Sequence, residues 1–248
     1  VGKGRGGGAV YRAKRILQPS DELVAVKYPA GRDELEALRA IEEKEAPCLG
    51  VPRLLPSGKH RDKPYVATEL LGAPLSDLFD KIDEEFDFDG KWQVIQLVGR
   101  MMLRRLEEVH RRGIVHGDVA PDNFLFGAAE SGTGLWLVDF GCARPFPNGR
   151  PVMAFWGTVE FTPMRMVDNV VRQPYDDLES LGYVLCHGLF GELPWFRWTK
   201  DRTTWEGKSR DQACEKVRQV KASMLWGQWA SLGFEFMHLM NMPTALGR

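Results

Sequence analysis

The fold is decided by one stretch near the middle of the chain, Val115-His116-Gly117-Asp118-Val119-Ala120-Pro121-Asp122-Asn123. Its two key polar residues, Asp118 and Asn123, stand five positions apart. An aspartate can accept or orient the proton of a substrate hydroxyl, and a carboxamide oxygen can hold a metal ion, so the pair suits phosphoryl transfer. Taken alone, the stretch could also be a turn rich in Asp, Pro and Asn that follows a helix.

A second acidic motif follows the first. Asp139-Phe140-Gly141 begins sixteen residues after Asn123 and comes directly after a β-type run at residues 135–138. A carboxylate at the end of a strand is a suitable ligand for Mg²⁺. Because a single Asp-Phe-Gly triplet is common by chance, its weight comes from its order relative to the other motifs.

The beginning of the chain adds features that suit phosphate binding. It is a glycine cluster, Gly2-Lys3-Gly4-Arg5-Gly6-Gly7-Gly8, and glycine lets backbone N–H groups come close to phosphate oxygens. On its own the cluster could equally be a flexible surface loop. The run Val24-Ala25-Val26-Lys27 then ends a β-type segment, and a helical segment that carries glutamates follows. This order of motifs through the chain is not expected by chance.

The composition is that of an ordinary globular protein. Of the 248 residues, 44% are hydrophobic and 27% are charged, which argues against a disordered chain. Lys and Arg total 33 and Asp and Glu total 34, so the formal net charge is −1 and a bulk binder of nucleic acid or of a membrane surface is not favoured. Four cysteines without CxxC spacing indicate a reducing, intracellular setting.

The two ends predict a piece of a longer protein. The chain starts with Val1, shows no signal-peptide pattern and contains no apolar run of the ~18 residues that cross a bilayer. We therefore expect a piece that is trimmed from a longer protein.

Periodicity predicts a β-rich first part and a helical second part that meet near Gly72. In the first part we expect a helix that starts at Asp33 and is ended by Pro47, and strands at residues 9–12, 23–27 and 64–71. In the second part we expect short strands at 123–126 and 135–138, a buried helix that includes residues 178–189, and an amphipathic helix that includes residues 95–109 and is capped by Gly113.

Together the motifs resemble those of a eukaryotic protein kinase of the casein kinase I superfamily, and most of all the vaccinia-related kinases. The resemblance covers essentially all 248 residues. It also rests on Glu69-Leu70-Leu71-Gly72 with Leu78-Phe79, Gly157-Thr158-Val159-Glu160-Phe161-Thr162, Asp176-Asp177-Leu178-Glu179-Ser180-Leu181-Gly182-Tyr183 and Leu193-Pro194-Trp195. It implies an α+β, bilobal protein kinase domain over residues 1–248, with a β-rich N-lobe of about 1–72 that holds one helix and a mainly helical C-lobe of about 73–248.

The resemblance assigns roles at the site. Asp118 would orient the substrate hydroxyl, Lys27 would grip the α- and β-phosphates of ATP, and Asn123 with Asp139 would hold Mg²⁺. Thr158 would bond the catalytic aspartate, which favours Ser/Thr over Tyr substrates. The ATP-binding set would be Gly2, Gly4, Gly8, Val10, Ala25, Lys27, Thr68, Glu69, Leu71 and Leu125.

The resemblance also assigns residues that would position the catalytic and ATP-binding residues. Glu34 is the expected helix partner of Lys27, with Glu36 as the alternative, and Asp177 would be the buried anchor of the catalytic loop. His116 and Phe140 complete this supporting set. Cys142 could be a reactive thiol, although a small packed side chain is the favoured interpretation.

The sequence departs from the family pattern at three places. Ala120 replaces the usual catalytic-loop Lys, and losing one charge partner of the transition state costs ~10²–10³ in rate. Gly117 replaces the usual Arg, and no Ser, Thr or Tyr stands between Asp139 and Gly157, which predicts activity without phosphorylation of this segment. The glycine loop is one residue longer than the family spacing, which predicts modest affinity for ATP.

Two hypotheses follow. The first is an active serine/threonine kinase that uses ATP and Mg²⁺, acts on protein substrates, and is a monomer in the cytoplasm or nucleus without a nucleic-acid or membrane partner. The second is a nucleotide-binding pseudokinase that works as a scaffold or regulator, which Ala120 and the altered glycine loop favour.

Overall fold

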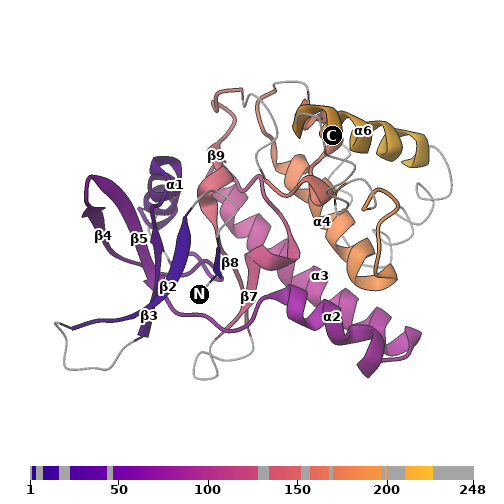
Figure 1. The fold of residues 1–248 in the computed structure, drawn as a ribbon, viewed down its shortest axis with the longest axis horizontal. Coiled ribbons are helices and arrows are strands. Elements are labelled where there is room, and N and C mark those ends of the chain that lie inside the picture. Colours follow the sequence, from indigo (N-terminus) through magenta and orange to yellow (C-terminus); the bar gives the residue numbers. More distant parts are fainter. Residues whose placement is uncertain are drawn as a thin grey trace.

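The computed structural model describes residues 2–3, 8–16, 23–43, 47–127, 134–151, 157–167, 170–196, 199 and 210–225. Figure 1 shows a sheet on one side of the molecule and a group of helices on the other. Short strands and turns that follow the longest helix lie between these two parts. The division into a β-rich first part and a helical second part agrees with the sequence prediction.

The sheet is antiparallel throughout and has the order β1-β2-β3-β5-β4. Its strands are β1 (Gly2–Lys3), β2 (Ala9–Lys14), β3 (Leu23–Tyr28), β4 (Leu54–His60) and β5 (Lys63–Glu69). The register sets Val10 opposite Lys27, and Ala25 opposite Thr68. The sheet therefore holds four residues of the predicted ATP site at neighbouring positions.

A single helix, α1 (Arg32–Glu42), accompanies the sheet. Its buried residues Glu34, Ala37, Leu38 and Ile41 follow helical spacing, as the sequence predicts. The helix ends at Glu42, so the prediction that Pro47 ends it was wrong. α1 contacts both β4 and the turn that follows Asp139, which places one face of this helix toward the site.

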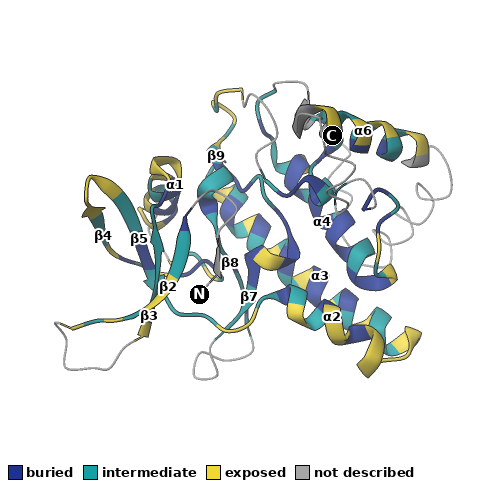
Figure 2. Ribbon diagram, viewed as in Figure 1, coloured by how far each residue is buried: buried dark blue, intermediate teal, exposed yellow. Residues whose placement is uncertain are grey.

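The second part contains α2 (Leu75–Glu85), α3 (Phe88–Arg111), α4 (Pro174–Phe190) and α6 (Arg210–Leu225). The predicted stripe on α3 is fully buried, and Gly113, with φ +76°, follows its C-cap. Figure 2 shows α4 mostly buried and the outer faces of α1 and α2 exposed. Among the described helices, none is both long enough and apolar enough to cross a membrane.

Two small antiparallel pairs carry the loops of interest. β6 (Ile114–Val115) pairs with β9 (Arg144–Pro145), and β7 (Phe124–Phe126) pairs with β8 (Leu135–Leu137). Four 3₁₀ turns join them to their neighbours: η1 (Pro121–Asn123), η2 (Phe140–Cys142), η3 (Val159–Phe161) and η4 (Met164–Val167). Asn123, expected at the start of a strand, belongs to η1 because Pro121 begins a tight turn there.

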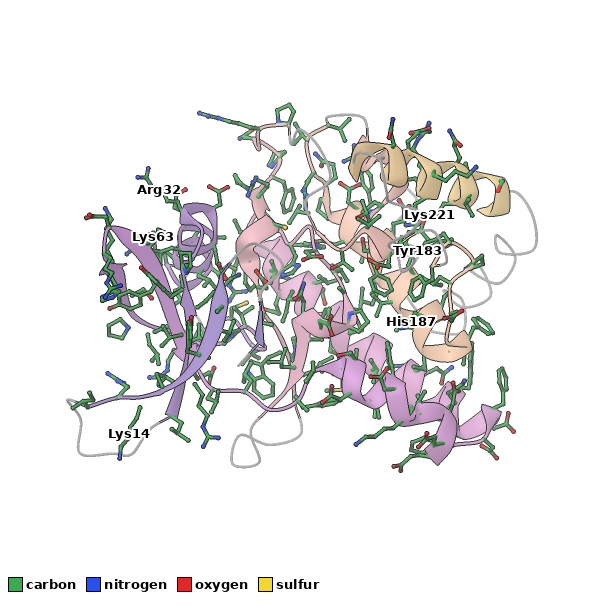
Figure 3. The ribbon with its side chains drawn as sticks, in the orientation of Figure 1. Lys14, Arg32, Lys63, Tyr183, His187 and Lys221 are labelled. Atoms are coloured by element: carbon green, nitrogen blue, oxygen red, sulfur yellow. The ribbon has the colours of Figure 1, made fainter. Side chains whose placement is uncertain are left out.

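One buried lysine fixes α6 to the rest of the helical part. Lys221 is 1% exposed, and its Nζ lies 4.1 Å from the ring centre of Tyr183 and 4.8 Å from that of Trp195. The same Nζ donates to the carbonyl of Thr162 at 2.6 Å, directly after η3. Figure 3 labels Lys221 and Tyr183 on the helical side of the molecule. This ammonium group therefore ties α6, α4 and the segment after η3 together.

Candidate active site

Lys27, on β3, is the centre of a charged cluster. Its Nζ lies 3.0 Å from the carboxylate of Glu34 on α1 and 2.6 Å from Oδ1 of Asp139. The carboxylate on α1 that contacts Lys27 is thus that of Glu34, the first of the two glutamates considered from the sequence. The cluster joins three segments that are far apart in sequence: the sheet, α1 and the loop after β8.

Lys27 and Asp139 each stabilise the charged form of the other. Burial alone would lower the pKa of Lys27, but Glu34 and Asp139 raise it above its ordinary value. Burial would raise the pKa of Asp139, but the charge and hydrogen bond of Lys27 lower it below its ordinary value. Burial raises the pKa of Glu34 against the opposing effect of Lys27. At neutral pH the site thus presents a lysine cation directly beside an aspartate anion.

Asp139 has an unusual backbone. Its φ of 61° and ψ of 71° lie in the left-handed region, which costs a non-glycine residue about 1–3 kcal/mol. Its Oδ1 accepts from Lys27 and from the N–H of Gly141 at 3.2 Å, and these bonds offset the strain. The carboxylate is therefore held in one place by its neighbours.

Asp118 is positioned from both sides. Its Oδ1 accepts the backbone N–H of Thr158 at 2.7 Å, and its own N–H donates to Nδ1 of His116 at 3.3 Å. A Cβ at Gly157 would lie 3.0 Å from Oδ1 of Asp118, so a glycine there permits the close approach. Within the described ranges no hydrogen bond reaches Oδ2 of Asp118, which leaves that oxygen to accept a proton.

The contact between Thr158 and Asp118 is made by the backbone. The sequence led us to expect a bond between these residues, and one exists, but the donor is the N–H of Thr158. Any residue type except proline can supply that donor. The contact therefore gives no support for a preference between Ser/Thr and Tyr substrates.

Asp177, in the first turn of α4, anchors the loop that carries Asp118. It is 1% exposed and accepts the N–H groups of His116 and Gly117, each at 2.8 Å. The ring of His110 lies 2.8 Å from its Oδ2. Burial would raise the pKa of Asp177, but its hydrogen bonds and the nearby histidines lower it below its ordinary value. The contacts are those expected of a buried anchor of the loop.

His116 connects the Asp118 loop to Asp139. Its Nε2 lies 3.0 Å from the carbonyl of Val138, and its ring packs edge-on against Phe140 at 5.0 Å between ring centres. Since Nδ1 accepts from Asp118, the neutral tautomer with the proton on Nε2 satisfies both contacts. The two predicted supporting residues, His116 and Phe140, therefore touch each other beneath the site.

Asn123 lies beside the strand that leads to Asp139. Its Nδ2 donates to the carbonyl of Asp118 at 2.7 Å, and its carbonyl accepts the N–H of Val138 at 2.9 Å. These bonds leave the carboxamide oxygen of Asn123 for a cation. One carboxylate and one amide oxygen are the hard donors that Mg²⁺ prefers, with phosphate oxygens and water completing its shell. Among the described residues, no group of three or more His, Cys, Asp or Glu could hold a metal ion without such help.

A family comparison now decides the fold. The model of the protein kinase domain matches residues 1–243 of the 248. The chain belongs to the protein kinase domain family. The strand-rich first part and helical second part are thus those of a kinase domain, and the resemblance to eukaryotic protein kinases is confirmed at this level.

The residues that the sequence assigns to ATP line up along the sheet and the segment after it. This segment pairs with β7, since Gly72 N–H donates to Phe126 O at 2.8 Å and Phe126 N–H donates to Ala73 O at 2.9 Å. Pro74 forms an antiparallel bridge with Leu125, while Ala25 and Thr68 are neighbours across β3 and β5. One carboxylate oxygen of Glu69 accepts the N–H of Arg53 at 2.8 Å, and the N–H of Glu69 donates to the carbonyl of Arg53 at 3.4 Å.

The glycine cluster of the kinase domain is described at its two ends, residues 2–3 and residue 8. Gly2 pairs with Val10 across β1 and β2, and the predicted residue Gly4 lies outside the described residues. A Cβ at Gly8 would lie 2.3 Å from the carbonyl of Pro29 and 3.5 Å from Cγ of Lys27. Glycine at position 8 therefore lets the backbone lie close to Pro29 and Lys27.

Two further predictions concern side chains near the loop. Ala120 is 2% exposed, so a methyl group is buried where the family pattern has Lys. Burial raises the pKa of the Cys142 thiol to about 12. A thiol that is protonated at neutral pH is a poor nucleophile, so the packed interpretation of Cys142 is supported over the reactive one.

Sequence reasoning missed three contacts of the site. These are the bond of His110 to Asp177, the ion pair of Arg144 with Asp33 at 3.0 Å, and the bond of Arg172 to Gly117. His110 follows Val109 at the end of the predicted amphipathic stripe. The hydrophobic spacing of that stripe does not predict a contact between His110 and Asp177. The only signal for Arg172 is a charged residue directly after the apolar pair Val170-Val171.

Proposed function

We propose that this kinase domain transfers the γ-phosphoryl group of ATP to serine and threonine hydroxyls of proteins, and that it belongs to the casein kinase I superfamily near the vaccinia-related kinases. The observation that carries the proposed phosphoryl transfer is the ion pair of Lys27 with Asp139, next to the Asp118–Thr158 contact. The choice of serine and threonine and the place in the superfamily rest on the sequence motifs. These contacts bring a phosphate-binding cation, a metal-binding carboxylate and a proton acceptor into one site.

The roles follow from the contacts. Lys27 holds the α- and β-phosphates, and the glycine-rich segment at residues 2–8 contributes backbone N–H groups to them. Oδ2 of Asp118 accepts or orients the proton of the substrate hydroxyl, while its other oxygen stays on Thr158. Asp139 and Asn123 hold Mg²⁺, which when bound neutralises charge on the phosphates.

The adenine ring needs an apolar sandwich and backbone partners. Val10, Ala25 and Leu125 supply the apolar faces, and Thr68 stands behind the base. The backbone groups of Glu69 and Leu71 bond its edge, which fits the engagement of the Glu69 carboxylate elsewhere.

The turnover is slow. With Ala120 in the loop, one cation is missing from the transferring phosphoryl group, and the expected loss is ~10²–10³ in rate. Since enzymes accelerate reactions by at least ~10⁶, activity remains measurable. The segment between Asp139 and Gly157 has no hydroxyl residue to phosphorylate, so the enzyme needs no such activation.

The assay uses γ-labelled ATP, Mg²⁺ and a mixture of basic proteins. We expect labelled phosphoserine and phosphothreonine with the wild type, a loss of ~10²–10⁴-fold in Asp118→Asn, and no change in Asp89→Asn, an exposed carboxylate on α3. Prior phosphatase treatment should leave the rate unchanged. Equal labelling by the wild type and Asp118→Asn would overturn the assignment of Asp118.

A second function has one specific observation in its favour. The buried Ala120 and the loss of its cation suit a pseudokinase that binds nucleotide and acts as a scaffold or regulator. In the same assay, absence of labelling together with clear ATP binding would favour this function.

A further inference from the structure

Arg172 is buried without an assigned role. It precedes α4 by two positions, is 2% exposed, and is the largest fully buried side chain among the described residues. Burying a guanidinium group costs several kcal/mol unless its donors are satisfied. The acceptors around the guanidinium group should therefore identify the role of Arg172.

The guanidinium group of Arg172 takes the space beside Gly117. Its Nη1 donates to the carbonyl of Gly117 at 2.5 Å. A Cβ at Gly117 would lie 1.5 Å from that nitrogen and 2.6 Å from Cζ, and the φ of Gly117 is +75°. No other residue type fits at position 117 while Arg172 stays where it is. The position of the Arg172 side chain thus requires a glycine at position 117.

The contact fixes the residue that precedes Asp118. Asp177 accepts the N–H of Gly117 at 2.8 Å, and Arg172 donates to its carbonyl. That carbonyl belongs to the same peptide group as the N–H of Asp118, which donates to His116. Both peptide groups of Gly117 are therefore held, and Asp118 has little freedom to turn.

Burial works against the charge of Arg172, and two nearby aspartates work in its favour. Burial and Arg144 lower the pKa of Arg172, while Asp177, Asp118 and Cys142 oppose this effect. The guanidinium group thus lies in the field of the two aspartates on which the loop depends. The positive charge of Arg172 therefore reduces the repulsion between the carboxylates of Asp177 and Asp118.

We propose that Arg172 is a built-in positioning residue that holds Asp118 in its reactive orientation, so that the loop needs no phosphate to order it. This rests on the proposed kinase function. The loop arginine that the family pattern places at 117 is absent, and a guanidinium group reaches the same place from the segment before α4.

The test compares Arg172→Met and Arg172→Lys with Arg112→Met. Arg112 is a matched control because its side chain is 9% exposed and, like Arg172, donates to a backbone carbonyl, here that of Glu108 near the end of α3. We expect kcat of Arg172→Met to fall at least ~10-fold while KM for ATP stays within ~2-fold, since Lys27 is untouched. Arg172→Lys should restore part of kcat, and Arg112→Met should lower only the melting temperature.

Two results would overturn the proposal. One is a kcat of folded Arg172→Met within ~2-fold of the wild type. The other is a loss of kcat that Arg112→Met shares at equal loss of melting temperature, which would make the effect one of stability alone.

Hydrogen exchange separates this proposal from the proposed function. In folded Arg172→Met, the amides of Gly117, Asp118 and Thr158 should exchange faster, whereas those of β8 should not change. Unchanged protection at the three loop amides would contradict the role of Arg172, whether or not the wild type phosphorylates proteins. A wild type without activity would remove the kinase function alone.

Discussion

At the scale of single residues, the site is a set of buried charges that fix one another. Asp177 is the clearest case, because its carboxylate accepts two backbone N–H groups and contacts His110. A charged acceptor makes such hydrogen bonds worth about 1.5–3 kcal/mol each. The loop that carries Asp118 therefore depends on one residue that never meets the substrate.

We expect Asp177→Asn to lower the melting temperature and to flatten its dependence on acid. The amide has one acceptor oxygen for two N–H donors, and a loss of about 3 kcal/mol corresponds to about 6–12 °C in a chain of this size. Because the folded pKa of Asp177 is lowered, its stabilisation is complete above the ordinary value near ~4 and is lost as the pH falls through the folded value.

The measurement is the melting temperature between pH 7 and pH 3. The wild type should lose stability in the acid part of this range more steeply than Asp177→Asn. Parallel curves for the two proteins would show that Asp177 carries no linked proton, against our assignment.

At the scale of elements, α4 joins the loop anchor to the core of the helical part. Its two internal glycines differ in their surroundings. A Cβ at Gly188 would lie 2.6 Å from Ile95 Cδ1 and 2.6 Å from Phe79 Cζ, whereas a Cβ at Gly182 would meet nothing within 4 Å. Gly188 therefore lets α4 approach α2 and α3 closely, whereas close packing does not require a glycine at position 182.

This contrast predicts opposite effects of one substitution in one helix. Gly182→Ala should stabilise the domain by about 0.5–1 kcal/mol, since alanine is the better helix former. Gly188→Ala should destabilise it by about 1–3 kcal/mol through overpacking against Ile95 and Phe79. Urea unfolding of the two variants measures both changes, and a stabilised Gly188→Ala would contradict the close packing described above.

Elements with a clean hydrophobic period were predicted from the sequence, and edge elements were not. The stripe on α3 and the buried helix α4 were found because their periods are regular. β4 was missed because it is an edge strand with Pro56 inside it and a bulge between Leu55 and Gly58. α2 was also missed, although Leu75, Phe79 and Ile82 have helical spacing and are all buried.

At the scale of the whole molecule, the site joins segments that are distant in sequence. Lys27, Glu34 and Asp139 could be grouped beforehand because each belongs to a recognisable motif. The bond of Arg172 to Gly117 could not, because it joins residues 55 positions apart and depends on how the segment before α4 crosses the loop. The order of the motifs thus predicts which residues form the site, while the packing of the chain determines the contacts that hold each of them.

Since Lys27 comes from the sheet and Asp139 from the loop after β8, nucleotide bound between them should stabilise both parts together. At a ligand concentration of 100 times Kd the gain is about 2.7 kcal/mol, or about 5–10 °C in melting temperature. We expect this shift with ATP and MgCl₂, and a much smaller one with ATP and EDTA, because the phosphates then meet the Asp139 carboxylate without a cation between them.

Asp139→Asn should remove the dependence on Mg²⁺, while Asp89→Asn should keep it. MgCl₂ without nucleotide serves as the control for general ion effects. If ATP stabilises the wild type equally with and without Mg²⁺, the metal is not held by Asp139, and nucleotide binding serves a role other than phosphoryl transfer. A metal-dependent shift that Asp139→Asn abolishes therefore links the contact between Lys27 and Asp139 to the function of the whole domain.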